Sequence, residues 1–195
     1  MKKHYSLIFL IKILVIPEIV LSNELPQGTV EIYGDIEMSA SFHESQRNGG
    51  STTGNDTQSV SIVTTYYAIN NVGIGLSVEY DSSEMTATNN SKSELSSYTI
   101  GPSLTYNMSL NEKFSFKITG VIAKVSSEFK GGGSTSKANG MAWLGRADLA
   151  YFFIDLVSLN AGVNYINISR EYDSEEVEID TSGFGVDIGI SVYIY

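Results

Sequence analysis

Residues 72–81 read VGIGLSVEYD, and residues 98–108 read YTIGPSLTYNM. In both stretches every second residue is apolar or aromatic, and the residues between are Gly, Ser, Thr, Asn or an acid. Successive side chains of a β-strand point to opposite faces, so this alternation predicts strands with one apolar and one polar face. The two stretches therefore indicate a sheet whose faces meet different surroundings.

The same alternation recurs along the chain from residue 30 to the end, and it predicts eight amphipathic strands. Their approximate ranges are 30–42, 59–68, 72–81, 97–108, 114–122, 141–151, 158–165 and 184–194. Most of these ranges are close to the roughly 9–11 residues with which a tilted strand crosses a bilayer. We therefore predict an all-β fold, an eight-stranded antiparallel up-and-down transmembrane β-barrel.

The predicted connections are of two kinds. Short turns are expected at 69–71, 109–112 and 153–155, and long segments rich in Gly, Ser, Thr and Asn at 43–57, 82–94, 126–140 and 169–178. Outer-membrane barrels have short turns on the periplasmic side and longer loops outside. The spacing therefore predicts three short periplasmic turns and four long outer loops.

Composition excludes several other classes of protein. The chain has 195 residues and no Cys, so one domain without disulfides or thiolate metal sites is expected. After the N-terminus it contains no apolar run of the roughly 20 residues that a membrane-spanning helix needs. A formal net charge of -10 argues against nucleic acid as a partner.

The N-terminus has the pattern of a secretory signal, in which basic residues precede an apolar segment at 7–16 and a cleavage position near Ser22. We expect residues 1–22 to be a signal peptide and residues 23–195 to be the barrel domain. An uncleaved anchor helix is the alternative, but Lys12 would be costly inside a bilayer.

Alternation alone does not tell which face is outside, because a water-soluble eight-stranded barrel would show the same period with an apolar interior. Aromatic residues of the apolar phase gather at the strand ends, as in the two interface girdles of membrane barrels. Those predicted near the long loops are Phe42, Tyr80, Tyr98, Trp143, Tyr165 and Phe184, and those near the short turns are Tyr66, Tyr106, Phe114 and Tyr151. The apolar phase carries essentially no charge, with Lys124 at its upper margin. These features favour lipid outside.

The signal, the eight strands and the chain end at 188–195, IGISVYIY, together resemble the small outer-membrane β-barrels of Gram-negative bacteria, the group of OmpX, the OmpA barrel and the opacity proteins. The resemblance implies location in the bacterial outer membrane, contact with its lipid and lipopolysaccharide, and insertion by the barrel assembly machinery. It implies no particular activity.

The polar phase would line the lumen, and it carries many more acids than bases. We predict a lumenal polar network of Glu31, Asp35, Glu37, Glu79, Lys117, Arg146, Asp148 and Asp187. Arg146, with its five donors, is expected to be the hub. The favoured interpretation is a plugged lumen held by ion pairs, and the alternative is a narrow, cation-preferring pore.

No motif for a cofactor, a metal ion or a catalytic group stands out. His43, Glu44 and Ser45 near an outer rim suggest a lipid A-modifying enzyme as a less favoured interpretation. We expect a monomer without cofactor that acts in envelope structure, or in cell-surface interaction through its long loops.

Overall fold

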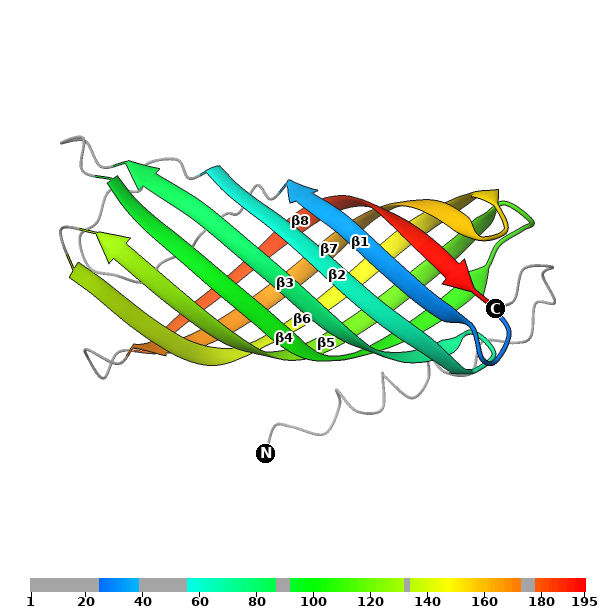
Figure 1. Cartoon of the computed structure of the whole chain (residues 1–195), viewed down its shortest axis with the longest axis horizontal. Helices are drawn as coiled ribbons and strands as arrows, with labels where there is room; N and C mark the ends of the chain where they lie inside the picture. The colour runs from blue at the N-terminus through cyan, green and yellow to red at the C-terminus, as the bar shows by residue number, and fades with distance from the viewer. Residues whose placement is uncertain (1–24, 39–55, 87–91, 132–133, 173–177) are drawn as a thin grey trace, which may run out of the picture.

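The computed structural model describes residues 25–38, 56–86, 92–131, 134–172 and 178–195. They form eight antiparallel strands in a closed barrel, with each strand paired to its neighbours in sequence and β1 paired to β8. The strands are β1 (Val30–Met38), β2 (Asp56–Ile69), β3 (Val72–Thr86), β4 (Lys92–Ser109), β5 (Phe114–Gly131), β6 (Ser134–Ile154), β7 (Val157–Tyr172) and β8 (Glu178–Ile194). They are tilted relative to the barrel axis (Figure 1). No helix that could span a membrane is found in these ranges.

The apolar phase of the strands faces outward and the polar phase faces the lumen. Ile74, Leu104 and Val186 are 56%, 58% and 58% exposed, whereas Arg146 and Asp187 are buried. A water-soluble carrier would have the opposite arrangement, because burial of apolar surface drives folding in water. The predicted fold is confirmed, and the alternative of a soluble barrel with an apolar interior is excluded.

Short turns connect the strands at the end where the chain terminates (Figure 1). The β2–β3 turn contains Asn70 and Asn71, and Asn71 adopts a φ of 64°, a left-handed conformation that Asn tolerates better than most residues. After Ser109 the side chain of Asn111 accepts hydrogen bonds from the backbone N–H groups of Lys113 and Phe114. These local contacts reverse the chain within a few residues, as the sequence predicted.

At the opposite end the strands run farther than the alternation predicted. β5 ends at Gly131 and β6 begins at Ser134, so nearly all of the segment expected as a loop at 126–140 is strand. The 21 residues of β6 would extend about 70 Å, well beyond a hydrocarbon core of about 30 Å even when tilted. Beyond the bilayer both faces meet polar surroundings, so the hydropathy alternation disappears while backbone pairing continues.

Candidate functional site: the polar lumen

Seven of the eight predicted network residues lie buried in the lumen. They are Glu31, Asp35, Glu79, Lys117, Arg146, Asp148 and Asp187. The eighth, Glu37, lies in β1, and its side chain is outside the described residues. Successive side chains of a strand point to opposite faces, and these seven residues occupy positions whose side chains point into the lumen.

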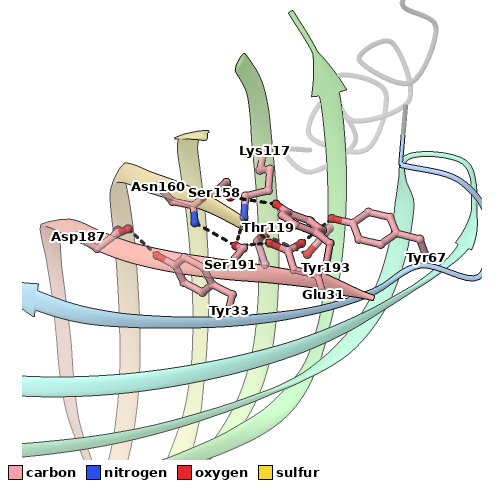
Figure 2. A network of polar contacts seen from close by, with 11 residues as sticks. Glu31, Tyr33, Tyr67, Lys117, Thr119, Ser158, Asn160, Asp187, Ser191 and Tyr193 are labelled. Atoms are coloured by element: carbon pink, nitrogen blue, oxygen red, sulfur yellow. Dashed lines mark hydrogen bonds and ion pairs between the residues drawn. The ribbon is translucent and has the colours of Figure 1, made fainter. Parts of the chain in front are cut away.

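Lys117 and Glu31 form the first ion pair that crosses the lumen (Figure 2). Lys117 Nζ lies 2.6 Å from Glu31 Oε1, although β5 and β1 stand on opposite sides of the ring. Glu31 Oε2 accepts a hydrogen bond of 2.7 Å from the hydroxyl of Tyr67. The hydroxyl of Ser191 donates to Glu31 and accepts from Lys117 and Asn160. Each charge is thereby surrounded by partners, as burial requires.

Arg146 forms the second crossing. Its Nη2 binds Asp35 Oδ2, and its Nε lies at an ion-pair distance of 3.5 Å from Asp187 Oδ2. Asp35 also accepts a hydrogen bond from Ser61, and Asp187 accepts one from the amide of Asn164. Arg146 on β6 therefore connects β1 and β8, which form the closing seam of the barrel.

Tyr33 links the two crossings. Its ring centroid lies 4.9 Å from Lys117 Nζ and 4.9 Å from Arg146 Cζ, and its hydroxyl donates to Asp187 at 3.1 Å. The negative π-face of the ring attracts both cations. Gly189 leaves room for this ring, because a Cβ there would approach Tyr33 to 2.7 Å.

An apolar and aromatic cluster, here called the floor, lies at the short-turn end of the lumen. Leu25, Tyr67, Ala150, Phe152 and Tyr193 form one buried cluster, and the rings of Phe152 and Tyr193 stack at 5.2 Å. The segment before β1 is tied beneath this end of the barrel by hydrogen bonds from the Leu25 N–H to the Asn71 side chain and from Gly28 N to Tyr67 O. The floor therefore consists of both strand residues and the N-terminal segment.

The outer half of the lumen differs from the prediction of a polar interior. On β5–β7 its inward side chains include an apolar cluster of Val125, Ala142 and Ile168, against which Ile166 packs. Arg170 crosses this region and donates from Nε to Ser127 Oγ at 3.1 Å. The lumen is thus polar and ion-paired near the short turns and partly apolar toward the outer end.

Sequence reasoning missed the lumenal tyrosines. Tyr33, Tyr67 and Tyr193 belong to the polar phase of their strands, whereas the predicted girdles belong to the apolar phase. That difference in phase was a signal, because an aromatic residue with a hydroxyl is suited to a buried site that offers a hydrogen-bond partner. Asn160, Asn164 and Ser191 were less detectable, since small polar residues are common throughout this phase.

Most of the predicted girdle residues lie on the outer surface as neighbours on adjacent strands. Tyr80 and Tyr98 are in ring contact at 4.8 Å, Trp143 and Tyr165 at 5.1 Å, Tyr165 and Phe184 at 4.8 Å, and Phe114 and Tyr151 at 5.1 Å. Tyr66 and Tyr106 are exposed on the same surface. Phe42, together with His43, Glu44 and Ser45, lies outside the described residues.

Comparison with known sequences gives the family of this chain. The family model described as "Outer membrane protein beta-barrel domain" matches residues 24–190. The chain belongs to this family. The family implies the bacterial outer membrane, with the short turns on the periplasmic side. No curated protein matches the sequence.

Solved structures of small outer-membrane barrels share the fold. OprG from Pseudomonas aeruginosa is 12% identical with a TM-score of 0.59, and the match covers 87% of this chain and 97% of OprG. Neisserial surface protein A is 17% identical with a TM-score of 0.56, covering 84% and 94%. Ail, the attachment invasion locus protein of Yersinia pestis, is 10% identical with a TM-score of 0.52, covering 86% and 99%. The similarity to these structures shows a common fold. At such low sequence identity a shared fold does not imply a shared activity.

Proposed function

We propose that this family member is an outer-membrane barrel with a plugged lumen, which acts in envelope structure or in cell-surface interaction through its outer end. The two ion-pair crossings and the aromatic floor carry the first part of the proposal. A barrel of eight strands has an interior just wide enough to be filled by side chains. Lys117, Arg146, Tyr33 and the floor residue Phe152 are all buried in this space.

Planar-bilayer recording of the purified protein tests the plug. We expect no resolved conductance steps from the wild type and increased leak from Phe152→Ala, which removes a stacked ring from the floor. Discrete cation-selective steps from the wild type would contradict the plug.

A narrow cation-preferring pore is the second candidate. It is supported by the surplus of acids in the described part of the lumen, where Glu31, Asp35, Glu79, Asp148 and Asp187 are buried with only Lys117 and Arg146 as buried bases. Such a surplus of carboxylates favours cations over anions. In the recording above, loss of cation selectivity in Asp148→Asn would support the pore, and a silent wild type would argue against it.

The extended outer hairpins support a role at the cell surface. Residues 126–131 and 134–140 continue the β5 and β6 strands beyond the apolar belt and present polar side chains. Two structural neighbours carry the names surface protein and attachment invasion locus protein. Replacing 126–140 by a short turn should abolish binding of whole cells to a surface ligand or phage, while the barrel keeps its heat-modifiable migration. Unchanged binding would locate recognition elsewhere.

The proposal also includes the biogenesis and the lack of enzymatic activity of the chain. Cleavage after residue 22, insertion by the barrel assembly machinery and a monomeric state fit the signal sequence and the closed ring. N-terminal sequencing of the protein from outer membranes tests the cleavage. Mass spectra of lipid A from cells with wild-type protein or His43→Ala should be identical, and a difference would support the lipid-modifying alternative.

A further inference from the structure

Lys124 is a charged side chain on the lipid-facing side of β5. It is exposed on the outward face, and its strand partners on either side are Ile100 and Met141. Ile122, one outward position nearer the periplasm, is 63% exposed, and Trp143 beside it belongs to the outer row of aromatic rings. Lys124 therefore stands where the apolar belt meets the outer boundary of the membrane.

Among the described residues, the neighbours of Lys124 on the same face include no acid. Its diagonal neighbours are Tyr98 and Pro102 on β4 and Asn139 and Trp143 on β6. Glu128 lies four residues farther along β5, about 13 Å away by strand rise, and it already pairs with Lys130 at 2.9 Å. The ammonium of Lys124 thus has no carboxylate counter-ion among these strand neighbours.

Two polar side chains lie next to Lys124 on the side that faces away from the periplasm. Ser126 and Asn139 are exposed partners in the β5–β6 ladder, one outward position farther from the bilayer. Below Lys124, Ile122 and Trp143 offer an apolar surface. The patch formed by Lys124, Ser126 and Asn139 therefore presents a cation, a hydroxyl and an amide. It lies next to an apolar surface that can contact acyl chains.

We propose that this patch binds a phosphate of lipid A in the outer leaflet. A lysine stem lies along apolar surface while its ammonium reaches the headgroup region, where an anion compensates its charge. Lipid A has phosphorylated sugars directly above its acyl chains, which matches the order of Lys124, Ser126 and Asn139 above Ile122. The inference rests on the proposed outer-membrane function, and it gives a site for the contact with lipopolysaccharide that the family resemblance implies.

Titration of the detergent-solubilised barrel with lipid A tests the site. Trp143 is the single tryptophan of the chain and lies beside Ile122, so its fluorescence reports on ligands at the patch. We expect Lys124→Gln to weaken binding of bis-phosphorylated lipid A about five-fold, the effect of roughly one basic residue at an anionic lipid surface. Lys124→Arg should bind like the wild type, and dephosphorylated lipid A should not distinguish the variants.

Lys130→Gln is the matched control, since Lys130 lies on the same face of β5 and already has Glu128 as its partner. Equal binding by wild type and Lys124→Gln, or an equal loss in Lys130→Gln, overturns the proposal. An equal dependence on Lys124 with phosphatidylglycerol vesicles overturns the assignment to lipid A. Heat-modifiable migration and membrane fractionation are measured in parallel. Absence of the wild type from the outer membrane would overturn the proposed function itself. If the wild type is present there, a negative binding result overturns only this site.

Discussion

Strand β5 contributes to two lysine–glutamate pairs in very different regions of the molecule. Lys117 meets Glu31 in the lumen at 2.6 Å, with side chains 4% and 2% exposed. Lys130 meets Glu128 beyond the apolar belt at 2.9 Å, with side chains 58% and 37% exposed. The two contacts have similar geometry, and the difference between them is burial.

Burial changes what each pair does for the barrel. Removing one partner from a buried pair leaves a charge without compensation in a poorly hydrated interior, which costs several kcal/mol. An exposed pair is screened by water and salt, and its loss is hard to detect. The lumenal pair is therefore expected to hold β1 against β5, whereas the outer pair is expected to contribute little to stability.

The largest effect is expected from Lys117→Met. The substitution leaves the carboxylate of Glu31 buried with only hydroxyl partners, so the free energy of unfolding should fall by about 3–5 kcal/mol. Urea unfolding in lipid vesicles, followed by Trp143 fluorescence, measures the change. A loss comparable to that of an exposed pair would show that the lumen is well hydrated around Glu31.

Arg146→Lys should have an intermediate effect. Lysine keeps the positive charge but lacks the planar guanidinium that contacts Asp35 and Asp187 together. We expect a loss of about 1–2 kcal/mol for one of two charge-assisted contacts. The same urea titration tests it, and wild-type stability would show that the Asp187 contact contributes nothing.

The double variant Lys117→Met with Glu31→Gln separates charge from packing. Without either charge the cost of an unpaired carboxylate disappears, and the side-chain carbonyl of the introduced glutamine would still accept from the hydroxyl of Tyr67. Stability within about 1–2 kcal/mol of the wild type is expected, because apolar replacements of buried ion pairs are often neutral. If the double variant is as unstable as Lys117→Met alone, packing around Lys117 is the main contribution.

Lys130→Ala is expected to leave the unfolding midpoint unchanged. In the wild type the ammonium of Lys130 and the carboxylate of Glu128 are both accessible to water, so the carboxylate stays hydrated when its partner is removed. The measurement is the same unfolding curve, at low and at high salt. A clear destabilisation would mean that the outer hairpin is ordered by this pair.

The pH dependence of the outer pair should be small and of known sign. The hydrogen bond and positive charge of Lys130 lower the pKa of Glu128 from its ordinary value of 4.5. A lowered pKa in the folded state means that the pair stabilises the hairpin above pH 4.5 and loses this effect as the pH falls through the lower value. NMR titration of the Glu128 carboxylate should show the shift, and Lys130→Gln should remove most of it.

The alternation of residue types predicted the eight strands and their outward faces correctly because side-chain direction in a strand has a period of two. It underestimated the lengths of β5 and β6 at their outer ends, where both faces of the strands carry polar residues such as Ser126, Ser127 and Lys130. It also placed Lys117 and Arg146 in the lumen without identifying their partners. The tyrosines of the inner phase were visible in the sequence and were not assigned a role.

The sequence by itself determined which side chains share a face, where the short turns lie and that each strand has one apolar face. These properties depend on local alternation. Only the tertiary structure decided that Lys117 meets Glu31 across 86 residues and that Arg146 meets Asp35 across 111. The reason is that closure of β1 on β8, with one particular register, brings opposite walls of the barrel within reach, and no local pattern encodes that distance.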